Sequence, residues 1–493
     1  MKARSTRLAR WLSGSLVAST ALLVASSASA VEAATEQEIH DAIQSAQAGT
    51  VIHVKKGKYK FTSAIWTAAA GAAGSPITLT ADAVGDVELD FDSEEGLVID
   101  HPYWIVEHVW INGVCPGACG GGSAGLHIKA TADHLIARGS RFSNFGEIIK
   151  SDRTPTSEVS DASILGNELY NDSPELTDGG TAIDLVGGKR WIVAGNYVHD
   201  YARDGVHYGI FLKGGTSDGV VERNLVIGAK VLPPGAGAAV GISFGGGGTG
   251  PQYCATDNMD ASYCTCEDFR GIARNNIIVN TSDAGLHTKR ACGSKFENNT
   301  VFGAGIGLQI QIEGPMAPVE LHNSILNGST SGKLLASDNL LGVSPADFKK
   351  IYADPDALDF SQGSDPSAAL HKGPSLPDVT DDYFGAPRGV MNTWGAVELP
   401  AAGNVWPWSF SGGMGAGGAG GGAAAGAGGG SASETTTVGA GTGSGTSGVG
   451  GGAPGDQASG GTDGCGCRVG ARGEAPSWIV LALIPWMVRR RRG

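Results

Sequence analysis

Basic, imidazole and acidic side chains recur at two fixed positions of a short motif in this 493-residue chain. The motif is a glycine or alanine followed by apolar, variable, apolar and variable residues, as in Gly125-Leu-His-Ile-Lys129 and Gly285-Leu-His-Thr-Lys289. In a β-strand the apolar residues would point to one side and the variable residues to the other. The motif therefore predicts two outward columns of side chains that could do chemistry.

The first outward column is expected to contain Val98, His127, Ile148, Asp184, Phe211, Ser243, His287 and Gln309. The second is expected to contain Asp100, Lys129, Lys150, Val186, Lys213, Gly245, Lys289 and Gln311, with Arg290 directly after Lys289. A solvated row of lysines that only protects a sheet is the structural alternative.

These columns predict binding of an extended anionic polymer, most simply a uronic-acid polysaccharide. The chain has a net charge of −14, and residues 31–400 hold 25 basic and 45 acidic residues. A polyanion would be attracted to the lysines and repelled elsewhere. The same acidic balance argues against nucleic acid as a partner. We predict that the substrate-binding residues are His127, Lys129, Lys150, Asp184, His287, Gln309 and Gln311.

Proton abstraction next to a uronate carboxylate needs a base and a group that stabilises the developing negative charge. A lysine can serve as base when neighbouring cations lower its pKa. We therefore predict Lys213 as the base, with Lys289 and Arg290 neutralising charge. Replacing Lys213 by alanine should then reduce cleavage.

The elements that must position these residues are repeated short strands. The motif starts at Gly96, Gly125, Gly146, Ala182, Gly209, Gly241, Gly285 and Gly307. A second motif, asparagine followed by apolar-rich residues, starts at Asn167, Asn196, Asn224, Asn276, Asn299 and Asn323. Two short strands per repeat describe a coil of stacked rungs that bury a shared core. The asparagines are predicted to form an internal hydrogen-bonded ladder.

Three segments complete a resemblance to the right-handed parallel β-helix of polysaccharide lyases, the pectate-lyase and chondroitinase-B-like superfamily. Thr35-Glu-Gln-Glu38 is a capping box that begins a short helix. Residues 48–59 resemble an opening rung, and residues 359–398 resemble a terminal segment. The resemblance implies an all-β, right-handed parallel β-helix over residues 31–400, closed by a short N-terminal helix. We expect a monomer.

The segment Tyr208-Gly-Ile-Phe-Leu-Lys213-Gly-Gly215 is similar to the strand that carries the catalytic lysine in some lyases of this fold. The resemblance implies lyase chemistry. Chondroitinase-B-like lyases have acidic calcium ligands near that lysine, whereas residues 208–211 here contain none. Ca²⁺ remains an expected cofactor only if Asp178, Asp184 or Asp204 bind it; each is otherwise a turn or surface residue.

Two other functions fit the same residues. A glycoside hydrolase would use Asp184 and Asp204 as acid and base, with carboxyl groups roughly 5–9.5 Å apart. A non-catalytic carbohydrate-binding surface protein, or adhesin, would use the columns only for binding.

Six cysteines lie in the body of the chain: Cys115, Cys119, Cys254, Cys264, Cys266 and Cys292. Their even number in an exported protein predicts disulfides, with zinc bound by the last four as the alternative. Three of them belong to an insertion outside the repeat rhythm, residues 245–269. We expect this insertion to overhang one edge of the lysine face.

The two ends of the chain predict export. Residues 1–30 resemble a signal peptide, with four basic residues, an apolar run and a final Ala28-Ser29-Ala30. Residues 401–463 form a linker rich in glycine, serine and alanine. Residues 464–493 contain Cys465, Cys467, an apolar stretch and an arginine cluster, and resemble the myxobacterial MYXO-CTERM sorting signal. That resemblance implies a sorting protease, anchoring through Cys465 or Cys467, and attachment to the outer membrane at the cell surface. Plain secretion is the alternative.

Overall fold

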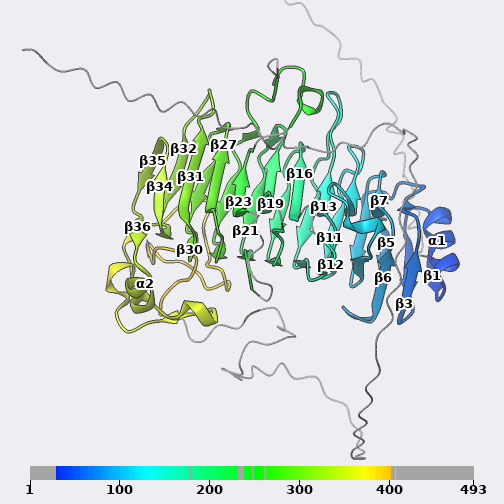
Figure 1. The fold of residues 1–493 in the computed structure, drawn as a ribbon, viewed down its shortest axis with the longest axis horizontal. Helices are drawn as coiled ribbons and strands as arrows, with labels where there is room; N and C mark the ends of the chain where they lie inside the picture. The colour runs from blue at the N-terminus through cyan, green and yellow to red at the C-terminus, as the bar shows by residue number, and fades with distance from the viewer. Residues whose placement is uncertain are drawn as a thin grey trace, which may run out of the picture.

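The computed structural model describes residues 29–176, 180–203, 205–230, 238–246, 249–259, 262–400 and 406. Within these residues, three long parallel sheets wind around one axis (Figure 1). Successive strands of the chain belong to different sheets, and each strand pairs with a strand of the next rung. The predicted parallel β-helix is confirmed.

Sheet A contributes one side of the coil. Its strands, in spatial order, are β1 (Ser29–Ala33), β2 (Thr50–Val54), β5 (Ile77–Thr80), β8 (Trp104–Glu107), β11 (Ile136–Arg138), β14 (Ser163–Leu165), β17 (Ile192–Ala194), β21 (Val220–Glu222), β25 (Ile272–Arg274), β29 (Lys295–Glu297), β32 (Val319–His322) and β35 (Leu334–Ser337).

Sheet B follows sheet A in each rung. Its strands are β3 (Gly57–Phe61), β6 (Val87–Phe91), β9 (Trp110–Gly113), β12 (Arg141–Ser143), β15 (Glu168–Tyr170), β18 (Tyr197–His199), β22 (Leu225–Ile227), β26 (Ile277–Val279), β30 (Thr300–Phe302), β33 (Ile325–Asn327) and β36 (Leu340–Val343).

Sheet C contains the strands of the glycine motif. They are β4 (Ile65–Trp66), β7 (Glu95–Ile99), β10 (Ala124–Ile128), β13 (Glu147–Ser151), β16 (Thr181–Val186), β19 (Val206–Lys213), β23 (Ala238–Phe244), β27 (Ala284–Lys289), β31 (Ile306–Ile312) and β34 (Ser329–Ser331). A small sheet consists of β20 (Thr216–Ser217), β24 (Asp268–Phe269) and β28 (Ala291–Cys292). Its strands follow the C-terminal ends of sheet C strands along the chain.

The apolar positions of the motif form the core of the coil. Leu126, Ile183, Ile210 and Leu286 are fully buried and stack from rung to rung on the inner side of sheet C. A coil of this kind gains its stability by burying each rung against its neighbours.

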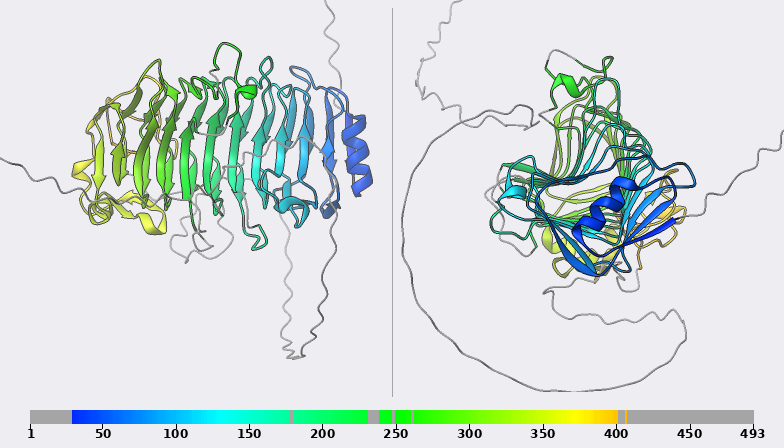
Figure 2. Two further views of the ribbon diagram at one scale, coloured as in Figure 1. Left: turned by 45° about the horizontal axis from the view of Figure 1, so that its top comes forward. Right: turned by 90° about the vertical axis from the view of Figure 1, so that its right-hand side faces the viewer.

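Helix α1 (Glu36–Ser45) closes the N-terminal end of the coil, as Figure 2 shows in the end-on view. The predicted capping box is confirmed: Thr35 accepts a hydrogen bond from the Glu38 backbone N–H at 3.2 Å. Ile39 and Ile43, on one face of the helix, are fully buried over the first rungs.

An asparagine ladder connects the turns between sheets A and B. Nδ2 of Asn167, Asn196, Asn224 and Asn276 each donates to Oδ1 of the next ladder residue, at 2.9–3.1 Å, ending at Asn299. The prediction of a ladder is confirmed, except at Asn323. Ile325 pairs with Thr300, so Ser324 rather than Asn323 follows Asn299 in the ladder.

The segment after β36 folds back over the outer side of sheet B. It contains α2 (Pro345–Ile351), the antiparallel pair β37 (Tyr352–Asp354) and β38 (Asp359–Gln362), and the pair β39 (Gly373–Pro374) and β40 (Met391–Asn392). Tyr352, Phe360 and Val397 join a second apolar cluster with Phe302 and Ile325 on sheet B. The predicted terminal segment is therefore a lateral cover.

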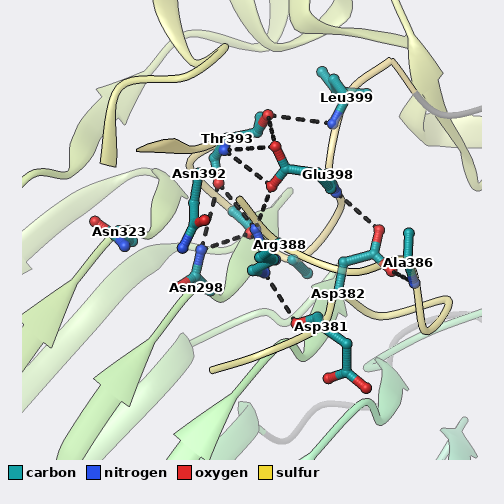
Figure 3. Close-up of polar contacts among 12 residues, drawn as sticks. Asn298, Asn323, Asp381, Asp382, Ala386, Arg388, Asn392, Thr393, Glu398 and Leu399 are labelled. Carbon is teal, nitrogen blue, oxygen red and sulfur yellow. Dashed lines mark hydrogen bonds and ion pairs between the residues drawn. The ribbon is translucent and has the colours of Figure 1, made fainter. Parts of the chain in front are cut away.

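Arg388 holds this cover in place through a buried polar network (Figure 3). Its guanidinium donates to Glu398 Oε2 at 3.0 Å, to the Gly395 carbonyl at 2.8 Å and to Asn275 Oδ1 at 2.9 Å. Asn275 lies in a turn of the coil, so the network joins the terminal segment to the rungs.

The predicted linker (residues 401–463) and sorting tail, with Cys465 and Cys467, lie outside the described residues, apart from Trp406. Residues 1–28 of the predicted signal peptide also lie outside them, whereas Ser29 and Ala30 begin β1 and pair with Thr50 and Val51. Among the described residues, no helix is both long enough and apolar enough to span a membrane.

Candidate functional site

The outward side of sheet C carries the first of the two predicted columns. Strand register places Trp66 beside Val98, Val98 beside His127, and His127 beside Lys150. The column continues through Asp184, Phe211, Ser243, His287 and Gln309. With parallel strands about 4.8 Å apart, neighbouring residues of the column are in side-chain contact range. We call this surface the sheet C face.

One rung of the predicted columns was misaligned. Glu147 pairs with Ala124 and Lys150 with His127, so the motif of this rung is shifted by two residues from Gly146. Ile148 is consequently a fully buried core residue rather than an outward one. Lys150 takes its place in the first column, and Asp152 follows Ser151 at the position equivalent to Lys129.

The lysines of the face are paired with carboxylates rather than freely exposed. Lys129 Nζ lies 3.2 Å from Asp152 Oδ2, and Lys213 Nζ lies 3.1 Å from Asp184 Oδ2. Lys150 Nζ lies 3.9 Å from Glu147 Oε2. Lys150 and Lys213 are 8% and 6% exposed. The expectation of an open row of cations is therefore wrong for this half of the face, because acidic residues from neighbouring rungs neutralise them.

His127 bridges two of these carboxylates. Its Nδ1 lies 2.5 Å from Glu95 Oε1, and its Nε2 lies 2.7 Å from Asp152 Oδ2. Burial favours the neutral ring, but the hydrogen bonds to Asp152 and Glu95 outweigh it and raise the pKa of His127. Burial likewise opposes ionisation of Asp152, yet the hydrogen bond from His127 lowers the pKa of that carboxyl to about 2. This end of the face is an internally neutralised cluster.

Two acceptor oxygens in the middle of the face lack hydrogen-bond donors among the described residues. They are Asp184 Oδ1 and Glu147 Oε2, both buried. Burial raises the pKa of Glu147, although Lys150 opposes the shift. A buried acceptor without a donor is costly in a folded protein.

Tyr208 and Phe211 form an aromatic centre beside Lys213. Their ring centroids are 3.8 Å apart, and Lys213 Nζ lies 4.5 Å from the Phe211 centroid. Burial raises the pKa of Tyr208 to about 12, with Lys213 acting in the opposite direction. Tyr208 is therefore a neutral phenol near pH 7 and a potential proton donor.

His287 is a neutral imidazole held in one orientation. Ser243 Oγ donates to the Gly245 carbonyl at 2.6 Å, so it accepts from His287 Nδ1–H at 2.7 Å. This network assigns the lone pair to Nε2. Burial lowers the pKa of His287 to about 4, and the charge of Lys289 contributes to this shift. A hydrogen bond with the Gln311 side chain acts in the opposite direction. The His287 ring centroid is 6.0 Å from that of Tyr208.

The Cys-rich insertion lies at the far edge of the face, as expected (Figure 1, green loop above the strands). Two disulfides hold it, Cys254–Cys264 and Cys266–Cys292, and Cys115–Cys119 pairs elsewhere. These pairings consume the thiolates that a zinc site would need. Tyr263 of the insertion lies 3.3 Å, centroid to guanidinium carbon, from Arg290, so the insertion covers part of the predicted cationic edge.

Glu267 joins the insertion to the strand that ends at Lys213. Its Oε2 accepts the backbone N–H of Gly214 at 2.8 Å. Burial raises the pKa of Glu267 to about 7, against the opposing effects of that hydrogen bond and of Lys213 and Arg290. Lys289, Gln309 and Gln311 lie nearby on β27 and β31 with partly or fully exposed side chains.

The structure brings together most of the predicted residues but not the hydrolase pair. Asp178 and Asp204 lie outside the described residues, so the Asp184–Asp204 distance stays a prediction. In the described ranges, no group of three or more His, Cys, Asp or Glu residues suits a metal ion, and Asp184 is engaged by Lys213. Calcium binding by Asp178, Asp184 or Asp204 therefore stays a prediction.

Sequence reasoning missed the partners of the predicted residues: Trp66, Glu95, Glu147, Tyr208, Ser243 as a histidine partner, and Glu267. Tyr208 directly precedes the motif glycine Gly209, which makes it visible as part of the same strand. Glu95 stands in the same relation to Gly96. The residue directly before the motif glycine can therefore indicate a site residue, and the predicted columns did not include this position.

Comparison with solved structures identifies polysaccharide lyases with the same architecture. The pectate lyase Pel9A superposes with a TM-score of 0.52 at 14% identity, covering 73% of this chain and 90% of the lyase. A rhamnogalacturonan lyase gives 0.45 at 14% identity, with coverages of 72% and 90%. An alginate lyase from Paenibacillus sp. gives 0.45 at 17% identity, with coverages of 63% and 99%. No protein-family model and no curated protein sequence matches the chain. The structural likeness establishes the parallel β-helix fold.

Proposed function

We propose that this protein is a carbohydrate-active β-helix protein that cleaves an acidic, uronate-containing polysaccharide by β-elimination at the sheet C face. One observation carries the proposal: a neutral histidine, oriented by Ser243, lies near a neutral tyrosine and next to Lys289. A base, an acid and a cation are the three groups that β-elimination from a uronate requires.

In the proposed reaction, His287 Nε2 accepts the proton from the carbon next to the carboxylate. A carbon–carbon double bond forms as the bond to the glycosidic oxygen breaks, and the Tyr208 hydroxyl protonates that oxygen. Lys289, supported by Lys213 and Arg290, neutralises the substrate carboxylate. Because the charge of Lys289 contributes to the low pKa of His287, a bound carboxylate would make the imidazole a stronger base.

This division of roles differs from that predicted from sequence. Lys213 forms an ion pair with Asp184, and an ammonium group has no lone pair with which to accept a proton. We therefore assign Lys213 to charge stabilisation. Support for carbohydrate as the ligand comes from Lys289, Gln309 and Gln311, whose partly or fully exposed side chains suit a carboxylate and sugar hydroxyls, and from the fold shared with a pectate lyase.

The test compares variants of the purified chain on polygalacturonate and alginate, measuring ultraviolet absorbance of unsaturated products. His287→Ala is expected to lower kcat by about 10²–10⁴-fold. His322→Ala is the matched control, because His322 Nδ1 also bonds a serine, Ser337 at 2.8 Å, but on sheet A. Full activity of His287→Ala with loss in Lys213→Ala would restore Lys213 as base.

Binding without cleavage is the second candidate function. Lys213 and His287 are only 6% and 3% exposed, which limits their contact with a substrate, whereas Gln309 and Gln311 remain accessible for binding. Wild-type protein that binds these polymers and releases neither unsaturated ends nor reducing ends would be a surface binding protein. New reducing ends without ultraviolet absorbance would instead indicate hydrolysis.

We also propose export and attachment to the cell surface, on the grounds of residues 1–30 and 464–493. Mass spectrometry of the protein from its native cells should find an N-terminus near residue 31 and a C-terminus that lacks the arginine cluster. Intact termini in the native protein would contradict this proposal.

A further inference from the structure

Trp66 is an exposed indole at the start of the same column that holds the proposed reaction site. It pairs with Val98 in register and is 42% exposed. By contrast, Asp184, Phe211 and His287 of the column are 3–5% exposed. Trp66 is therefore an aromatic side chain of the column that a ligand can reach.

The position of Trp66 is fixed by neighbours on both sides. Gln44 of helix α1 donates to the Trp66 carbonyl at 2.6 Å, which occupies a backbone acceptor of this edge strand. Lys129 Nζ lies 5.4 Å from the centre of the ring and is itself tied to Asp152. The helix therefore holds the backbone of Trp66, and Lys129 contacts its indole ring, while the residue stays 42% exposed.

An exposed indole held in this way suits the face of a sugar ring. The electron-rich face of an aromatic ring attracts the partly positive C–H groups of a pyranose. The ionic cluster beside Trp66 is neutralised internally, so attraction here does not depend on a substrate carboxylate. A single exposed tryptophan is common on protein surfaces. Trp66 differs from a scattered surface residue because it is aligned with the column that holds the proposed reaction site.

The rungs set the distance between Trp66 and the reaction site. Four rung steps separate β4 from β16, which carries Asp184, and three more lead to β27, which carries His287. At about 4.8 Å per step these distances are about 19 Å and about 34 Å. A polymer that follows the column would reach Trp66 several sugars away from the bond that breaks.

We propose that Trp66 is a remote sugar-stacking subsite that binds the same acidic polysaccharide several residues away from the cleaved bond. This inference rests on the proposed function of the sheet C face. It implies that the protein binds long chains more tightly than short ones.

The test measures binding of polygalacturonate and alginate, and of their di- and trisaccharides, by isothermal titration calorimetry with the full chain. Trp66→Ala should weaken polymer binding by about threefold to tenfold and leave trisaccharide binding unchanged. Trp66→Phe keeps an aromatic ring and should recover most of the affinity. Melting temperatures of both variants would check folding.

Trp110→Ala is the matched control. Trp110 lies on the outer side of sheet B and also has a cation near its ring, Arg141 at 6.0 Å, but it is outside the column. Its loss should leave polymer binding unchanged. Equal polymer binding by wild type and Trp66→Ala, or equal losses for polymer and trisaccharide, would overturn the subsite alone. Absence of uronate binding by the wild type would overturn the proposed function and the subsite together.

Discussion

The carboxyl group of Glu267 shows how a single residue of the face couples charge to stability. It serves as an acceptor for the Gly214 N–H, a role that a neutral oxygen performs equally well. Burial raises its pKa to about 7, whereas a glutamate in an unfolded chain ionises near pH 4.3. Between these two pH values the folded protein binds more protons than the unfolded chain, so the free energy of unfolding falls as the pH rises.

Glu267→Gln should therefore stabilise the protein at pH 8 and have little effect at pH 4.5. The gain at pH 8 is expected to be at most about 4 kcal/mol, since the two pKa values differ by about 2.7 units and one unit corresponds to about 1.4 kcal/mol. Urea unfolding at both pH values measures the difference. Glu313→Gln, at an exposed position, is the control and should change neither value. A gain of equal size at both pH values would contradict the titration argument.

For single residues, the sequence predicted which side chains point out of the core better than it predicted their ion pairing and burial. Alternation placed Asp184 and His287 in one outward column and Lys213 in the other, and both columns were predictable from the motif. Ion pairing between neighbouring rungs was not, because it depends on side chains such as Glu95 and Asp152 that reach across strands. The predicted cationic row becomes a set of local ion pairs for this reason.

Among the elements, the asparagine ladder makes a prediction that separates the middle of the coil from its end. Replacing Asn224 by alanine removes the acceptor for Asn196 N and Nδ2, and the donor to the Val193 carbonyl. All of these groups are buried, and each unsatisfied group costs about 1–3 kcal/mol. Asn224→Ala should lower the free energy of unfolding by roughly 3 kcal/mol or more.

Asn339→Ala is the comparison at the last rung. Asn339 makes the same kind of contacts, to Ser324 N and the Leu321 carbonyl, but it is only partly buried. Water can replace those bonds, so the expected loss is about 1 kcal/mol. Denaturant unfolding of both variants would show the difference. Equal losses would mean that ladder bonds contribute independently of burial.

The repeated elements were predictable because every rung repeats one physical requirement. The irregular rungs were not. The motif of β13 begins two residues after Gly146, which places Ile148 in the core, and Ser324 takes the ladder position that was expected for Asn323. In each case strand pairing with the neighbouring rung determined the register, and that pairing cannot be seen in one segment of sequence alone.

The whole molecule combines a coil of nearest-neighbour contacts with one segment that links distant rungs. In the turns between sheets A and B, the left-handed residue is glycine at Gly139, Gly166 and Gly195. In the rungs that the terminal segment covers, the left-handed turn residue is Arg223, Asn275, Asn298 or Asn323. The side chains of these four residues bond the segment: Arg223 and Asn275 bind Asp381, Asn298 binds Thr393, and Asn323 binds Pro374. Polar residues thus occupy turn positions that glycine fills in three preceding rungs, and they attach the cover.

Arg388→Ala should release this cover before the coil unfolds. The variant leaves Glu398 buried without its cation, a loss worth about 3–5 kcal/mol for a buried pair. It also removes the bond to Asn275. Limited proteolysis should then cut first between residues 352 and 399, and the melting temperature should fall. Arg190→Ala breaks an exposed pair with Asp161 and should cost at most about 1 kcal/mol. If Arg388→Ala were first cut within the rungs, the terminal segment would be an integral part of the coil rather than a cover attached to it.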